Sequence, residues 1–130
     1  MPEPSPPSAV WVTASELLSR FDGLAVSELP GGLRLVQAST RRARRRGLGG
    51  LKDLPADQGL EIATTAIHTF TMHFPLDLIW RARDGRVVRV DRAVPRGRIR
   101  TCLRARSVIE VATGAADGFL AGLKMAAERG

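Results

Sequence analysis

The pattern of apolar and polar residues predicts a chain built mainly of short strands. Segments rich in valine, leucine and isoleucine recur between turn-forming residues such as Pro30-Gly31-Gly32 and Asp84-Gly85, which is typical of locally connected antiparallel strands. Besides a hairpin at Asp84-Gly85, strands are predicted at 24–29, 33–38, 59–65 and 107–112. We expect a mainly β (α+β) fold, with a compact, mostly antiparallel, barrel-like sheet and two or three short helices.

Helices are predicted near both ends of the chain and once in its middle. Thr13-Ala14-Ser15-Glu16 has capping-box spacing and begins a helix that ends near Arg20. Ser39 or Thr40 can cap the middle helix, and Gly47 can end it in a left-handed conformation. The last helix, at 117–128, has apolar residues at helical spacing, namely Phe119, Leu120, Leu123 and Ala127.

Arginines dominate the middle helix. At about 100° per residue, one broad face carries Arg41, Arg42, Arg45 and Arg46, whereas Arg44 points the other way beside Ala43. We therefore expect a solvated basic face and a single arginine directed inward.

The register of the hairpin around Asp84-Gly85 follows from its apolar residues. A two-residue turn would mix apolar and charged side chains on both faces, whereas a three-residue loop, Arg83-Asp84-Gly85 with Gly85 at positive φ, separates them better. This register predicts that one face is buried and the other is turned outward. The buried face would hold Leu78, Trp80, Ala82, Val88 and Val90, and the other Asp77, Ile79, Arg81, Val87, Arg89 and Asp91.

Length and composition set the class of protein. The chain has 130 residues, so we expect a Pro-rich, disordered N-terminus at 1–9 and a single small β-rich domain at 10–130. No apolar run approaches the roughly 20 residues that cross a bilayer, so we expect no membrane insertion. The first residues lack the basic start of a signal peptide, and Cys102 has no second cysteine to pair with. A cytoplasmic location is therefore predicted.

The charge suggests an anionic partner. The net charge is +7, and 18 of the 20 cationic residues are arginine, whose planar guanidinium suits phosphate and carboxylate. A biased codon composition would give the same excess. On an extended strand, evenly spaced arginines would line one side, either as an anion-facing stripe or as the polar face of an edge strand that discourages aggregation. This arginine stripe comprises Arg96, Arg98, Arg100, Arg104 and Arg106.

Three blocks of the sequence resemble the domain-of-unknown-function family 192 (DUF 192), a small uncharacterised family of bacteria and archaea. Ala38-x-Thr40-x-x-x-Arg44-x-x-Gly47-Leu48 is similar to its first block, and Met72–Asp77 followed by the Asp84-Gly85 hairpin to its central signature. Residues 105–111 with Gly114 are similar to its closing Ala-x-x-Val-Leu-Glu-Leu-x-x-Gly block. The order and spacing agree over roughly two-thirds of the chain, from 33 to about 114.

The sequence also departs from that family. Ala43 stands where the family usually has Glu, Gly49 where it often has Met, and His68-Thr69-Phe70-Thr71 replaces a common Trp-Met-Lys-Asn. A helical tail replaces the closing turn and strand. The resemblance implies a compact, mainly β, barrel-like domain with helical decoration and no established activity.

The leading hypothesis for function is a non-catalytic ligand-binding or accessory module. Asp77 follows Pro75 in an apolar strand, so its carboxylate needs a partner, and we expect this partner to be the inward-facing Arg44, in a pair that is either structural or functional. The resulting shallow pocket would be formed by Thr40, Arg44, Gly47, His68, Met72 and Asp77.

Two other functions remain open. The first is binding of nucleic acid or another polyanion through the arginine stripe, or through Arg41–Arg46, although these runs lack interleaved aromatic residues. The second is a small hydrolase-like enzyme that uses His68 or His73 with Asp77. Cys102 could serve as a nucleophile or, with the histidines, as a metal ligand, and the candidates for acid–base pairs are Glu61, Asp77 and Glu110. No metal site, catalytic residue or cofactor is predicted, and the partner is unknown, either an anionic ligand or a protein.

Overall fold

The computed structural model describes residues 15–129, and within this range the chain forms eight strands and three helices. The helices are α2 (Ser15–Arg20), α3 (Arg41–Arg46) and α4 (Ala116–Arg129). The strands are β1 (Val26–Leu29), β2 (Leu33–Ala38), β3 (Gln58–Ile62), β4 (Ala66–His68), β5 (Leu76–Arg81), β6 (Val87–Val94), β7 (Ile99–Thr101) and β8 (Ser107–Ala112). Residues 1–9 and Thr13, for which disorder and a helix cap are predicted, lie outside the described range.

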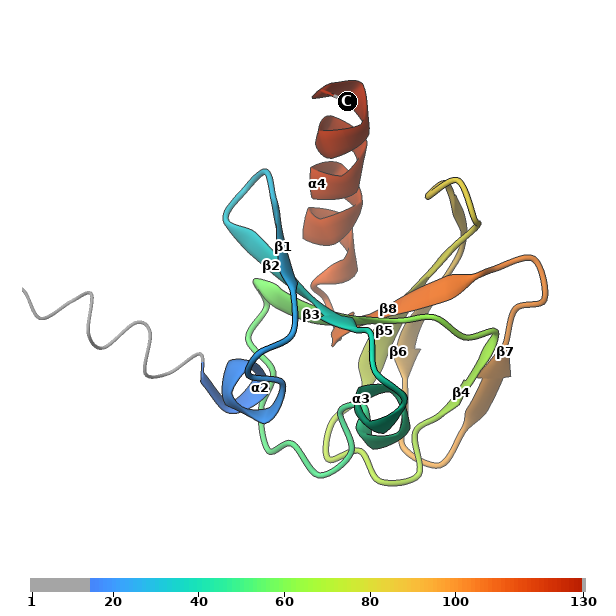
Figure 1. Cartoon of the computed structure of the whole chain (residues 1–130). Coiled ribbons are helices and arrows are strands. Elements are labelled where there is room, and N and C mark those ends of the chain that lie inside the picture. Colours follow the sequence, from blue (N-terminus) through green and yellow to red (C-terminus); the bar gives the residue numbers. More distant parts are fainter. Residues whose placement is uncertain (1–14, 130) are drawn as a thin grey trace, which may run out of the picture.

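A six-stranded sheet in the order β1-β2-β3-β8-β5-β6 organises the molecule (Figure 1). All of its neighbouring strands are antiparallel except β2 and β3, which run parallel because α3 and a long loop carry the chain back between them. The sheet is not closed, since β1 and β6 remain its edges. A separate two-stranded ribbon pairs β4 with β7. The mainly β, mostly antiparallel fold with short helices is confirmed.

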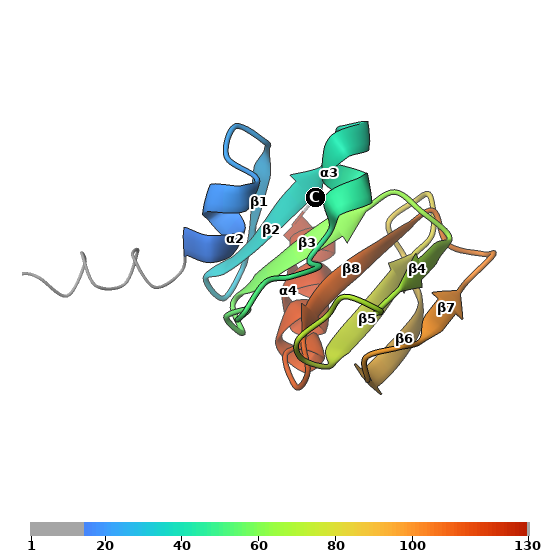
Figure 2. The same ribbon diagram turned by 90° about the horizontal axis from the view of Figure 1, so that it is seen from below.

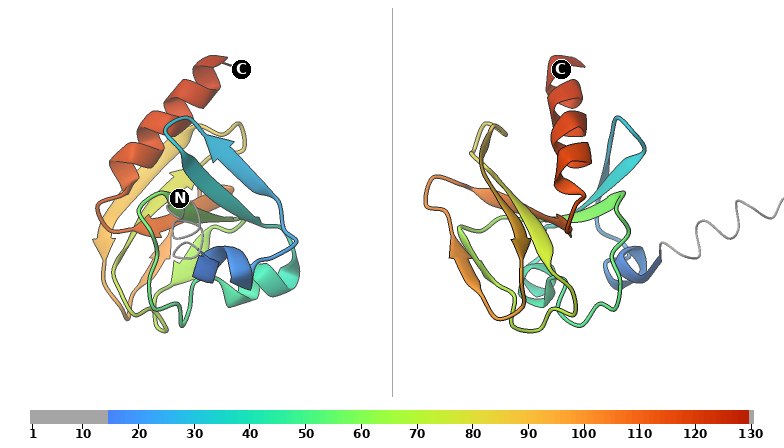
Figure 3. Two further views of the ribbon diagram at one scale, coloured as in Figure 1. Left: turned by 90° about the vertical axis from the view of Figure 1, so that its left-hand side faces the viewer. Right: turned by 180° about the vertical axis from the view of Figure 1, so that it is seen from behind.

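Each face of the large sheet carries its own core. On one face, α4 rises between the β1–β2 and β5–β6 hairpins (Figure 3), and Phe119 packs with Ile79 and Ile109. On the other face lie α2, α3 and the β4–β7 ribbon (Figure 2), which cover Trp80 and its neighbours. Trp80 is 0% exposed. Strand β5 is buried on both faces because it runs inside the sheet between β8 and β6.

The hairpin between β5 and β6 has the predicted loop but not the predicted register. Residues 83–85 form the three-residue loop, with Gly85 at φ 89°. A bulge at Val88 then shifts the ladder by one residue, so that Val90 lies opposite Ile79, and Trp80 lies opposite Arg89. The predicted common face of Trp80 and Val90 is therefore wrong, because Val90 packs on the α4 side.

The ends of α3 lie where the sequence predicts them, but the side chains on its faces are not oriented as predicted. The Thr40 hydroxyl accepts a hydrogen bond from the Ala43 N–H at 3.0 Å and caps α3, and Gly47 has a positive φ of 51°, although its ψ of −148° is not left-handed helical. The predicted inward direction of Arg44 is wrong, because Ala43 occupies the buried face of this short helix and Arg44 is exposed. Within residues 15–129, no helix has the length and apolar character to cross a membrane.

Candidate functional site

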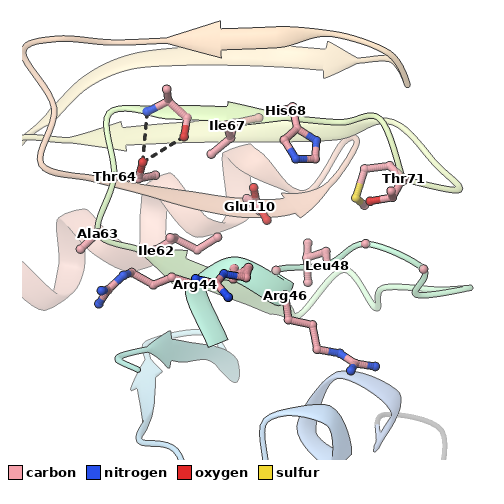
Figure 4. Close-up of a pocket in the computed structure, with 16 residues that line it drawn as sticks. Arg44, Arg46, Leu48, Ile62, Ala63, Thr64, Ile67, His68, Thr71 and Glu110 are labelled. Atoms are coloured by element: carbon pink, nitrogen blue, oxygen red, sulfur yellow. Dashed lines mark hydrogen bonds between the residues drawn. The ribbon is translucent and has the colours of Figure 1, made fainter. Parts of the chain in front are cut away.

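A cavity of about 740 Å³ lies between α3 with the glycine loop that follows it and the β4 ribbon (Figure 4). Its lining comes from α3 and the loop 47–50, from the end of β3, from β4 and the segment after it, and from Glu110 of β8. Its walls are mainly apolar, and its mouth carries three exposed arginines. The apolar walls are formed by Leu48, Ile62, Ile67 and Met72, and the arginines are Arg44, Arg45 and Arg46, of which Arg46 extends toward α2 (Figure 4).

Glu110 lies on the floor of this cavity. It sits in the middle of β8, an interior strand, with Leu60 of β3 and Leu78 of β5 as its direct neighbours on the same face. Both leucines are 0% exposed. The side chain points from β8 into the space between α3 and β4 (Figure 4). A charged residue therefore occupies a position at which the sheet otherwise places core side chains.

The environment of Glu110 disfavours its negative charge. The residue is only 5% exposed, and among residues 15–129 no side chain or backbone group forms a hydrogen bond or ion pair with its carboxyl group. Burial alone raises the pKa of Glu110 from 4.5 to about 7. At neutral pH this carboxyl group can therefore both donate and accept a hydrogen bond.

Arg20 of α2 fixes the loop that forms one wall of the cavity. Its Nη1 donates hydrogen bonds to the carbonyl oxygens of Gly47, at 3.2 Å, and Gly49, at 2.7 Å. Partial burial, followed by the nearby charge of Arg46, lowers the pKa of Arg20. Arg20 thus holds the loop 47–50 through its backbone carbonyl groups and does not itself line the cavity.

The opposite wall is formed by the segment after β4. The Gly50 N–H donates to the Thr71 carbonyl at 3.1 Å, which joins the glycine loop to this segment. A Cβ atom added at Gly49 would collide with Oγ1 of Thr71, so the close approach requires a glycine. The His68 ring stacks on Phe70, with centroids 4.9 Å apart, and its Nδ1 accepts from the Phe70 N–H at 3.3 Å. His68 and Thr71 both line the cavity.

The structure brings together most of the predicted pocket and leaves out two members. Arg44, Gly47, His68 and Met72 line the cavity. Thr40 lies on the other side of α3, where it caps the helix and borders a smaller hollow beside α2. Asp77 does not line the cavity.

Asp77 is a structural residue, and the predicted pairing with Arg44 is wrong. Its carboxylate, 1% exposed, accepts hydrogen bonds from the backbone N–H groups of Ala93 (2.8 Å), Gly114 (3.0 Å) and Ala116 (3.3 Å), and from the Thr113 hydroxyl (3.3 Å). These donors come from β6 and from the turn into α4. Donors from distant parts of the chain, mostly backbone N–H groups, satisfy the buried charge, so no arginine is required.

The histidine–aspartate site is not assembled in the structure. His68 lies at the cavity with Phe70 as its partner, whereas Asp77 is occupied by backbone groups elsewhere. His73 is exposed, and Cys102 is buried, at 4% exposure. In the part of the chain that the structure describes, no three His, Cys, Asp or Glu side chains gather as they would around a metal ion.

The arginine stripe does not run along one strand. Strand β7 covers only Ile99–Thr101, and turns on either side of it separate the five arginines. Arg96 donates to the Phe70 carbonyl at 3.0 Å, and Arg104 to the Val88 carbonyl at 3.3 Å. The stripe is therefore not a linear row: four of its arginines are exposed on turns before and after β7, and Arg100 within β7 is partly buried.

Glu110 is predicted from the sequence only as one of three candidates for acid–base pairs. Two features of the sequence point more directly to it. In 107–112 apolar residues occupy both parities around Glu110, which indicates a strand buried on both faces and therefore a buried carboxyl group. It also occupies the Glu position of the closing family block. Three of the positions that depart from the family pattern, Gly49, His68 and Thr71, lie around the same cavity.

Comparison with known proteins identifies relatives of unestablished function. The model of the DUF192 family, described as "Uncharacterized ACR", matches residues 27–125. A crystal structure of a protein of unknown function from Novosphingobium aromaticivorans has a TM-score of 0.59 and 17% identity, and covers 75% of this chain and 87% of that chain. A putative transcription regulator from Sinorhizobium meliloti has a TM-score of 0.60 and 20% identity, and covers 72% and 82%. These likenesses concern the fold. No curated protein matches the chain.

Proposed function

We propose that this chain, which belongs to the DUF192 family, is a non-catalytic binding module for a small molecule with an acidic group. The proposal rests on the chemistry of its cavity. The acidic group would bind at the mouth, beside the exposed Arg44 and Arg45. The apolar walls would hold the rest of the molecule. Ligand sites of this kind are mostly apolar with a few convergent polar groups.

The observation that carries this proposal is the buried Glu110 carboxyl group on the cavity floor. An ionisable group that is 5% exposed and has no partner within residues 15–129 lowers the stability of the fold. An apolar residue would suit the position between Leu60 and Leu78 better. Residues that oppose folding in this way are typical of functional sites.

Within residues 15–129, no hydrogen bond or ion pair joins Glu110 to a second reactive group, which supports binding over catalysis. The carboxyl group has burial as the cause of its raised pKa, with no neighbouring charge contributing. Hydrolysis by a carboxyl group commonly combines it with a second acid or base held at the same site. In the described residues, His68 at the cavity wall is bonded to Phe70 rather than to an acid.

Binding of small anions tests the proposal. Titration of isotope-labelled protein with short carboxylates and alkyl phosphates should shift the backbone amide signals of the loop 47–50 and of Glu110 in two-dimensional NMR. Arg44→Gln should weaken this binding, whereas Arg41→Gln, on the same helix but outside the cavity lining, should not. If the two variants lose affinity equally, or if the shifts spread evenly over all basic surfaces, the proposal is wrong.

Binding of a polyanion is the second candidate function. It is favoured by a specific observation, namely that the stacked pair His68 and Phe70, the latter 48% exposed, lies next to Arg96. A solvent-facing ring among cations is what single-stranded nucleic acid uses for stacking. Arg100 of β7, which pairs with Ile67 of β4, adds a second cation to this region.

Retention on heparin and on single-stranded DNA distinguishes the two candidates. The polyanion function predicts retention that falls steeply with salt. It also predicts that Phe70→Ala binds single-stranded DNA more weakly than the wild type does. Replacing Arg96, Arg98 and Arg100 with Gln should reduce the salt dependence by about one counterion per lost phosphate contact. If wild type and Phe70→Ala bind DNA equally, bases do not stack on Phe70, and the retention reflects only nonspecific charge attraction.

A further inference from the structure

We infer that the ligand of this cavity is bipolar: besides the acidic group for the arginines, it carries a hydroxyl or amino group that binds Glu110. This inference rests on the proposed binding function and adds the chemical class of the ligand. The two polar ends of the cavity come from different elements, the cations from α3 and the acid from β8.

The need for a hydrogen-bond donor follows from what Glu110 lacks. Its direct neighbours across the sheet are the apolar side chains of Leu60 and Leu78, and none of the donors in residues 15–129 reaches its carboxyl group. A ligand that filled the cavity without a donor would displace water from the carboxyl group and leave it unpaired. That loss of solvation opposes binding. A ligand with an O–H or N–H group at this depth removes the penalty.

The order of the two ends follows from the charges. Arg44 and Arg45 are exposed at the mouth, whereas Glu110 is buried at the floor. An acidic group placed at the floor would meet a second acid, and an amine placed at the mouth would meet the guanidinium groups. The ligand therefore enters with its hydroxyl or amino end first. Between the two ends, Leu48, Ile62 and Met72 favour a hydrocarbon segment.

The proton on Glu110 separates a hydroxyl from an amine. With a pKa near 7, the carboxyl group is partly protonated at neutral pH. An ammonium group binds the ionised form, so its binding releases a proton and its affinity should rise as the pH passes through this value. A hydroxyl group can donate to the ionised form and accept from the protonated one, so its affinity should depend less on pH.

Matched probes test the inference on the intact protein. For each chain length from butanoate to octanoate, the plain acid is compared with the acid that carries a terminal hydroxyl and with the one that carries a terminal amine. Dissociation constants come from NMR titration between about pH 6 and pH 8, on either side of the Glu110 pKa. At the best length, a terminal donor should improve affinity about tenfold or more, as expected for a hydrogen bond to a charged group.

Two substitutions of Glu110 refine the result. Glu110→Met keeps the length of the side chain and removes its polar atoms, so the terminal donor should no longer improve affinity over the plain acid. Glu110→Gln keeps an acceptor without a charge, so the benefit of a hydroxyl should be partly retained and the pH-dependent benefit of an amine lost. Because the wild-type comparison stands alone, a variant that fails to fold does not remove the test.

The outcomes separate this inference from the function on which it rests. If plain acids bind as tightly as their hydroxyl and amino counterparts at every length, the cavity binds acids, and the inference that its ligand carries a donor for Glu110 is wrong. If the donor improves affinity equally in Glu110→Met, the donor is recognised elsewhere and the inference is again wrong. If no probe of any kind shifts the signals around the cavity, the proposed function itself fails.

Discussion

The carboxylate of Asp77 accepts a hydrogen bond of 2.8 Å from the backbone N–H of Ala93, the one non-glycine residue in the described range with a positive φ, 52°. Ala93 lies at an irregularity in the β5–β6 ladder, where Leu76 pairs with Val94 although Leu78 pairs with Asp91. The same carboxylate receives N–H groups at the start of α4. One buried acid thus holds a bulge of the edge strand and the turn into the last helix.

We predict that Asp77→Asn destabilises the protein without changing the cavity. The amide NH₂ group cannot accept hydrogen bonds, so at least one of the backbone donors at Ala93, Gly114 and Ala116 loses its partner. Leaving such a buried donor unpaired costs about 1–3 kcal/mol. Urea denaturation measures the loss, and Asp84→Asn in the exposed hairpin loop is the control, which should change stability by no more than about 0.5 kcal/mol. Unchanged stability of Asp77→Asn would contradict the structural role.

We predict that Ala93→Gly stabilises the protein slightly. A positive φ is unfavourable for a residue with a Cβ atom and is free of this strain for glycine. The greater freedom of glycine in the unfolded chain offsets part of the gain, so the net increase should be at most about 1 kcal/mol. The comparison is with Ala82→Gly in the same hairpin, which should lose stability because no strain is relieved there. A lower stability of Ala93→Gly would show that the bulge is not strained.

The pKa of Glu110 predicts how stability depends on pH. Below pH 4.5, the folded and unfolded states both hold the proton, and Glu110 contributes no difference. Between 4.5 and about 7 the unfolded state loses its proton first, so rising pH favours unfolding by about 3 kcal/mol in total. Above this range the effect is constant.

Glu110→Gln should abolish this dependence. Relative to wild type, the variant should gain stability progressively as the pH rises from 4.5 to about 7, as measured by urea denaturation at a series of pH values. Glu128→Gln, at an exposed position of α4, is the matched control and should follow the wild type. If the free energy of unfolding changes with pH in the same way for wild type and Glu110→Gln, the carboxyl group has a partner in solution. The inference that Glu110 is unpaired would then be wrong.

Local sequence features predicted much of this fold because they act over a few residues. The turn at Pro30-Gly31-Gly32, the Thr40 cap and the Gly85 loop each depend on adjacent backbone geometry, and each is found in the structure. The ladder beyond the Gly85 loop was wrong for the same reason: the bulge at Val88 depends on what packs against both faces of β5. Alternation in sequence cannot predict register where both faces are buried.

The site was harder to predict because it depends on contacts between distant segments. The glycine loop, β4 and β8 are joined only through the sheet order and the β4–β7 ribbon, which the sequence did not predict. Asp77 looked functional because it is an acid in an apolar strand, but backbone groups far along the chain satisfy it. Glu110 has the same local appearance, but within residues 15–129 it has no such partners. Only the arrangement of the neighbouring strands tells the two acids apart.

Gly49 tests whether the close contact between the two cavity walls matters. A Cβ atom at this position would collide with Oγ1 of Thr71 and lie 3.3 Å from its Cβ. Gly49→Ala should therefore push the glycine loop away from Thr71, lower stability by about 1–3 kcal/mol and shift the amide signals of Gly50 and Thr71. Gly118→Ala is the matched control, since nothing lies within 4 Å of its added Cβ in α4, and it should gain about 0.5–1 kcal/mol from helix propensity.

The double variant Gly49→Ala with Thr71→Ala identifies the colliding group. Removing the Thr71 hydroxyl frees the space that the new Cβ needs, so the double variant should recover most of the stability lost in Gly49→Ala. Its cavity should also regain affinity for the acidic probes, because the Gly50 N–H to Thr71 carbonyl bond that joins the walls uses only backbone atoms. Additive losses in the double variant would mean that the two walls are not coupled through this contact.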